Sequence, residues 1–151
     1  MKKLSIFLAS SIVEFKTARP KIGDYVLEYN NQMFESSKKI KLFECEYYDE
    51  AISLNRKQDD YMEVLKQCDL FFMLIGKKLG NYTLEEYEVA LQNDVERHIF
   101  FLKKKEYDSS ILEFQKLLKK DSKAHIYEIE KIEEVKPILY ALANEKLETK
   151  M

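Results

Sequence analysis

The stretch "CDLFFMLIGKKLGNYTLEEYEVAL" (residues 68–91) joins a run of apolar residues to a segment with helical spacing. Residues 70–75 are apolar at every position rather than at every second one, which predicts a strand covered on both faces. Leu84, Tyr87 and Leu91 follow at i, i+3 and i+7, so they share one stripe of a helix. A buried strand that leads into an amphipathic helix is typical of a parallel α/β sheet.

The same two kinds of segment alternate along the chain. Short runs rich in Ile, Phe and Leu predict strands at residues 3–10, 40–46, 70–76, 98–103 and 124–129. Helical spacing occurs at residues 12–34, 59–67, 83–93, 110–120 and 131–148. The crossovers between strands are long enough for right-handed parallel connections. We therefore expect a parallel sheet with helices on both faces and the most apolar runs at its centre.

Length and composition indicate one ordered domain over residues 1–151, which can also be part of a longer protein. Gly and Pro are scarce, and the net charge of −2 argues against a nucleic-acid partner or an anionic membrane surface. No run approaches the roughly 20 apolar residues that a membrane span needs. Two cysteines are too few for a disulfide framework, which favours a cytoplasmic location.

Motifs for cofactors are missing from the sequence. With Gly23, Gly76 and Gly80 as the only glycines, the chain has neither a dinucleotide-binding glycine motif nor a P-loop. We therefore expect no bound cofactor. His98 and His125 have no carboxylate or cysteine at metal-ligand spacing, so the sequence predicts structural histidines and no metal site.

Three glutamates, Glu85, Glu86 and Glu88, lie at the start of the helix expected at residues 83–93. Thr83 and Glu86 have the spacing of a capping box, in which each side chain satisfies an exposed backbone amide. Acidic residues also suit the positive end of the helix dipole. On this interpretation none of the three needs a catalytic role.

The position of this helix supports a second interpretation. In open parallel sheets, ligands bind beyond the carboxyl ends of the strands, so Ser10 and Ser11 are candidates to line a cleft. Glu86 lies one turn before the small residue Ala90, which leaves room beside the carboxylate. We therefore expect Glu86 to face a ligand and Glu85 to face solvent.

Two segments, "IFLASSIVEFKTAR" (residues 6–19) and residues 68–91, resemble the TIR-like domains of bacterial proteins. The resemblance covers residues 3 to about 103, and weakly extends to 130. It implies a three-layer αβα, flavodoxin-like fold with five parallel strands in the order 2-1-3-4-5. It also implies cleavage of NAD⁺ between nicotinamide and ribose by a glutamate four residues before an alanine, which here is Glu86. A nearby carboxylate can stabilise or trap the oxocarbenium-like state of such a reaction.

The resemblance further implies which residues surround the substrate. The segment 47–60 corresponds to a mobile loop after the second strand that gates the pocket and joins neighbouring copies. This chain lacks the Trp that commonly precedes the glutamate in the family, so tyrosines are the candidates to cover the nicotinamide. The expected substrate-binding residues are Ser10, Ser11, Arg19, Tyr47, Tyr48, Gly76 and Tyr82.

Three hypotheses for the function follow. The leading one is an NAD⁺ hydrolase or cyclase, acting as an antiphage effector or signal producer that self-association activates, with a fused or separate sensor domain. The second is a non-catalytic TIR interaction module, in which Glu86 only caps a helix. The third is an enzyme like the nucleoside deoxyribosyltransferases, which also use a glutamate after the third strand, although their early Gly-rich and Asp-containing signature is absent here. Nucleobase exchange would separate the third from NAD⁺ cleavage.

Overall fold

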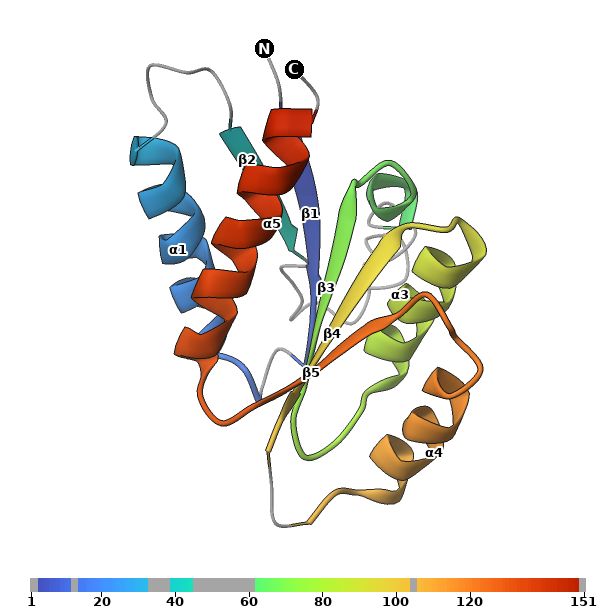
Figure 1. Cartoon of the computed structure of the whole chain (residues 1–151). Coiled ribbons are helices and arrows are strands. Elements are labelled where there is room, and N and C mark those ends of the chain that lie inside the picture. The colour runs from blue at the N-terminus through green and yellow to red at the C-terminus, as the bar shows by residue number, and fades with distance from the viewer. Residues whose placement is uncertain (1–2, 12–13, 33–38, 45–61, 104–105, 150–151) are drawn as a thin grey trace, which may run out of the picture.

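The computed structural model describes residues 3–11, 14–32, 39–44, 62–103 and 106–149. Its core is a sheet of five parallel strands in the order β2-β1-β3-β4-β5, as predicted (Figure 1). The strands are β1 (Lys3–Ala9), β2 (Lys39–Glu44), β3 (Leu70–Ile75), β4 (Glu96–Leu102) and β5 (His125–Ile129).

Helices cover both faces of this sheet and complete the expected three-layer αβα arrangement (Figure 1). One face carries α1 (Ala18–Gln32) and α5 (Val135–Thr149), which is preceded by the short 3₁₀ helix η1 (Ile132–Glu134). The other face carries α3 (Asn81–Gln92) and α4 (Ser109–Leu118), together with helical residues 62–66. The flavodoxin-like fold is therefore confirmed.

The central strand β3 explains why its sequence is apolar at every position. Leu70, Phe72 and Leu74 pack into the core beneath α1 and α5. Phe71 and Met73, like Ile75, alternate with them and pack into the core beneath α3 and α4. Since all six side chains are buried, an alternating pattern would have placed polar groups in one of the two cores.

The start of α3 differs from the expected one. The helix begins at Asn81, two residues early, and its N-cap is Gly80 with extended backbone and no capping side chain. The predicted capping box of Thr83 and Glu86 is therefore wrong, because both residues lie inside the helix and are buried, at 5% and 3% exposure. Packing of this helix face on the sheet decides their orientation rather than the free amides of the first turn.

Among the residues that the structure describes, no helix is both long and apolar enough to cross a membrane.

Candidate active site

Glu86 is the only one of the three clustered glutamates that turns toward the sheet. The buried face of α3 consists of Thr83, Glu86, Tyr87 and Ala90. Glu85 and Glu88 are exposed, so the expectation that Glu85 faces solvent is confirmed. A carboxyl group with 3% exposure in this face is costly unless its environment compensates for lost hydration.

The environment of Glu86 changes its acidity strongly. Burial raises the pKa of the Glu86 carboxyl to about 8, while the positive charge of Arg19 lowers it and the negative charge of Glu85 raises it further. The cost of burying the charge therefore exceeds the attraction of Arg19. A carboxyl group that exchanges its proton near neutral pH is typical of catalytic sites.

Arg19, whose charge acts on the Glu86 carboxyl group, is hydrogen-bonded to Ser10. Arg19 lies in the first turn of α1 and is buried, and its Nη1 donates a hydrogen bond to Ser10 Oγ over 2.6 Å. Ser10 directly follows β1 and is itself buried. The fold thus brings together three of the residues expected from the sequence, and they come from a strand end and two helices.

The chain after β1 adds an acidic group that the sequence-based reasoning missed. Ser11 opens a turn in which its Oγ accepts the Glu14 N–H over 3.3 Å. The Glu14 carboxylate then accepts the backbone N–H of Lys77 and lies against Gly76, directly after β3. A Cβ at position 76 would overlap that carboxylate, so glycine leaves the space that Glu14 occupies. The only sequence signal for Glu14 is its place in the segment that follows the first strand.

The tyrosines expected at the site have different outcomes. Tyr82 lies in the first turn of α3 and is 42% exposed. Tyr47 and Tyr48, with the whole segment 47–60, lie outside the described residues. Aromatic cover of a substrate base by any of the three therefore stays a prediction.

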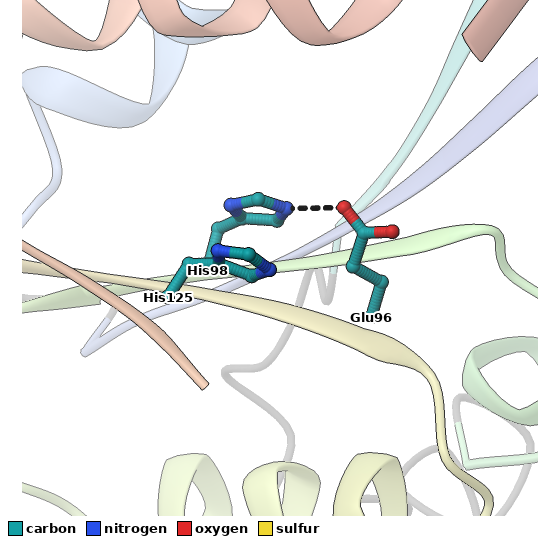
Figure 2. Close-up of side chains that lie close together, drawn as sticks. All are labelled: Glu96, His98 and His125. Carbon is teal, nitrogen blue, oxygen red and sulfur yellow. Dashed lines mark hydrogen bonds and ion pairs between the residues drawn. The ribbon is translucent and has the colours of Figure 1, made fainter. Parts of the chain in front are cut away.

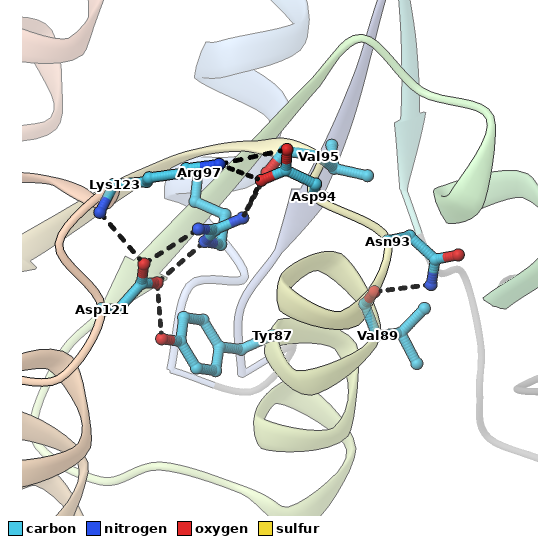
Figure 3. Close-up of polar contacts among 8 residues, drawn as sticks. All are labelled: Tyr87, Val89, Asn93, Asp94, Val95, Arg97, Asp121 and Lys123. Atoms are coloured by element: carbon cyan, nitrogen blue, oxygen red, sulfur yellow. Dashed lines mark hydrogen bonds and ion pairs between the residues drawn. The ribbon is translucent and has the colours of Figure 1, made fainter.

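A buried polar network holds α3 in the rotation that directs Glu86 inward. Tyr87, the next residue, donates its hydroxyl to Asp121 over 2.7 Å (Figure 3). Asp121 also accepts two hydrogen bonds from Arg97 of β4, from Nε over 2.8 Å and from Nη2 over 2.9 Å. Such a bidentate pair fixes geometry as well as contributing energy. The network therefore ties α3 to β4 and to the turn before β5.

The histidines differ from their expected surroundings. His98 lies in β4 with 1% exposure, and its Nε2 is 2.8 Å from Oε2 of Glu96 (Figure 2). The expectation that no carboxylate lies near the histidines is therefore wrong. The reason is strand geometry: Glu96 and His98 are two positions apart and share a face, and register pairs His98 with His125 of β5.

No family model and no curated protein matches this chain. Solved structures do share its fold. The CMP N-glycosidase BcmB of Clostridium botulinum has a TM-score of 0.58 and 17% identity, over 89% of this chain and 97% of that chain. A 2-deoxyribosyltransferase of Bacillus psychrosaccharolyticus has a TM-score of 0.53 and 16% identity, over 87% and 90%. A conserved protein of Enterococcus faecalis has a TM-score of 0.51 and 13% identity, over 99% of both chains.

These comparisons correct the expectation of an NAD⁺ hydrolase or cyclase, and with it the antiphage role that depended on this activity. The two neighbours of named activity process a nucleotide and nucleosides, which agrees with the third hypothesis from the sequence rather than the first. The physical reason is that a glutamate on the helix after the third strand does not by itself identify the substrate. None of these three structures is a TIR domain. A relationship between this chain and the TIR domains stays a prediction.

Proposed function

We propose that this chain is an enzyme that cleaves the N-glycosidic bond of a nucleoside or a nucleoside 5′-monophosphate, with Glu86 as its nucleophile. The observation that carries the proposal is the buried Glu86 carboxyl under the charge of Arg19, which Ser10 binds at the end of β1 where the parallel strands end. The activities of the CMP N-glycosidase and the 2-deoxyribosyltransferase that share this fold support it.

The proposed reaction needs only groups of the chain and water. The Glu86 carboxylate attacks C1′ of the sugar, and the bond from C1′ to the base nitrogen breaks with its electron pair on the base. The base takes up a proton from water. Water then attacks C1′, loses a proton to the solvent and releases the Glu86 carboxylate, or the nitrogen of a second base attacks, loses its proton to the solvent and gives a new nucleoside.

Arg19 has two roles in this proposal. Its charge favours the ionised form of Glu86 against the effect of burial. Its guanidinium also has the geometry that binds phosphate, so a nucleoside 5′-monophosphate is the preferred substrate class. Ser10 holds the guanidinium in place through the hydrogen bond from Nη1.

The test is release of free base from a panel of nucleoside 5′-monophosphates and 2′-deoxynucleosides. Glu86→Gln keeps the shape of the side chain and removes the nucleophile, so we expect the rate to fall by at least about 1,000-fold. Glu88→Gln is the matched control, because Glu88 is an exposed carboxylate on the same helix and its loss should leave the rate unchanged. Release that survives Glu86→Gln, or a folded wild-type protein without release from any substrate, contradicts the proposal.

Adding a second base to the same reaction separates the two possible acceptors. Formation of the exchanged nucleoside identifies a transferase, and release of free sugar or sugar phosphate identifies a hydrolase. Self-association, a sensor domain, independence from cofactors and a cytoplasmic location stay predictions from the sequence.

A further inference from the structure

Three potential metal ligands lie close together at the amino-terminal ends of the strands. Ser10 and Arg19 lie at the opposite, carboxyl-terminal ends. Glu96 and His98 come from the start of β4, and His125 is the first residue of β5 (Figure 2). One ligand atom from each residue lies within 4.8 Å of the other two. We propose that this cluster binds a divalent transition-metal ion, for which Zn²⁺ fits best. The proposal is independent of the function proposed for Glu86.

The types of ligand favour zinc. Two imidazoles and one carboxylate are a donor set that Zn²⁺ uses in proteins, with water in the fourth position of a tetrahedron. Alkaline-earth ions prefer oxygen ligands and would leave two nitrogen donors unused. The sequence predicted no metal site, because the histidines are 27 positions apart and only the register of β4 and β5 brings them together.

The distances are compatible with binding after small movements. His98 Nε2 and Glu96 Oε2 are 2.8 Å apart, close to the about 3.3 Å between two ligands of a tetrahedral ion with bonds of about 2.0–2.1 Å. The rings of His98 and His125 are stacked with centroids 4.6 Å apart, and one nitrogen of each ring lies within 4.8 Å of the other and of a Glu96 oxygen. His98 is buried and fixed by its neighbours. His125 is exposed, so its side chain can rotate to bring its nitrogen within bonding distance of the ion.

A second hydrogen bond prepares His98 for this role. Its Nδ1 lies 2.9 Å from the hydroxyl of Tyr127 on β5. A tyrosine hydroxyl can donate or accept, so Nδ1 can carry the ring proton and donate it to Tyr127, which frees the Nε2 lone pair for the metal. Metal-bound histidines generally have such a partner on the other nitrogen.

Lys146 opposes binding and provides a sharp control. Its Nζ lies 2.6 Å from Oε1 of Glu96, so the ion would bind Oε2 and meet the repulsion of the ammonium group. Access is open, because Glu96 and His125 line a hollow of about 470 Å³ at the surface.

The experiment is calorimetric titration of the full chain with ZnCl₂, after removal of metals by a chelator and of the chelator by desalting. We expect one ion per chain. The chain has only two histidines, so NMR of the imidazole protons should show both sets of resonances shifting together with saturation at one equivalent. A wild-type protein that binds no zinc at millimolar concentration overturns the proposal.

Matched variants locate the ion. His125→Gln changes an exposed side chain and should weaken binding by more than about 100-fold, beyond the 10–100-fold typical of lost outer partners. Glu128→Gln changes an exposed carboxylate three positions after His125 in β5, on the opposite face of the strand from His125 and Tyr127, and should leave the affinity unchanged. Tyr127→Phe should weaken binding by about 10–100-fold, and Lys146→Met should tighten it. Binding that survives His125→Gln places the ion elsewhere and overturns the proposal.

Discussion

At the scale of single residues, Glu86 combines a proposed catalytic role with a cost in stability. Burial raises the pKa of its carboxyl from 4.5 to about 8, so between these pH values the folded state keeps a proton that the unfolded state releases. The contribution of the protonated Glu86 carboxyl to the stability of the folded state is fully present below pH 4.5 and is lost as pH rises through 8. The free energy of unfolding should fall by up to about 1.4 kcal/mol per pH unit in this window.

Glu86→Gln should remove this dependence on pH. A glutamine resembles the protonated carboxyl, so the variant should be close to wild type in stability at pH 5 and more stable than wild type at pH 8.5. Urea unfolding at the two pH values measures the difference. Equal stability of the two proteins at pH 8.5 would contradict this prediction, because the charged carboxyl would then not destabilise the folded state.

The same pKa predicts the pH profile of the proposed reaction. Only the ionised carboxyl is a nucleophile, so kcat/KM for base release should rise with pH and level off above about 8. The measurement is base release at low substrate concentration between pH 5.5 and 9.5. A rate that falls across this range would instead make Glu86 a general acid.

At the scale of elements, Arg97 and Asp121 join helix α3 to the sheet. Both side chains are almost completely buried, at 2% and 4% exposure, and together with Tyr87 they connect β4, α3 and the turn before β5. Arg97 keeps Asp121 ionised, since its hydrogen bonds lower the pKa of that carboxyl. A buried pair of this kind is costly to break from one side, because the remaining charge loses its partner.

Asp121→Ala should therefore destabilise the protein by about 3–5 kcal/mol, and Tyr87→Phe by only about 1 kcal/mol. Asp94→Asn is the matched control, because Asp94 is exposed and its Oδ1 is 4.0 Å from Arg97 Nη1. That exposed pair should contribute less than about 1 kcal/mol. Urea unfolding at pH 7 tests all three, and a similar small loss for Asp121→Ala and Asp94→Asn would contradict the importance of the buried pair.

At the scale of the whole molecule, one sheet separates two cores. Leu139 of α5 lies in the core on one face and Phe114 of α4 in the core on the other, and both are nearly fully buried. The strands contribute alternate side chains to both cores, as β3 does, so loss of one core removes support for the other. We expect the described part of the chain to unfold as one unit.

Leu139→Ala and Phe114→Ala test this coupling from the two sides. The first should cost about 2–5 kcal/mol and the second about 3–5 kcal/mol, because each leaves a cavity in a packed core. In thermal unfolding, both should lower the midpoint of a single transition followed by near-UV and far-UV circular dichroism. Two separated transitions in either variant would contradict the single domain that the sequence predicts.

The local sequence determined the elements of this protein and the residue at the centre of its candidate site. Continuous apolar runs identify buried strands because both faces of β3 are covered, and helical spacing places Glu86 on a face with Ala90. These patterns are short-range, since they depend on the geometry of one strand or one helix. The order of the strands, expected from a resemblance, needed the assembled sheet to confirm it.

Tertiary structure alone decided what surrounds each of these side chains. The hydrogen bond from Arg19 to Ser10, the approach of Glu14 to Gly76 and the cluster of Glu96, His98 and His125 all join residues through sheet register or helix packing. Packing on the sheet likewise favours a start of α3 at Asn81 rather than Thr83. It also buries Glu86, which local rules assign to a helix cap. A pKa near 8 follows from burial by distant parts of the chain, which no spacing along the sequence encodes.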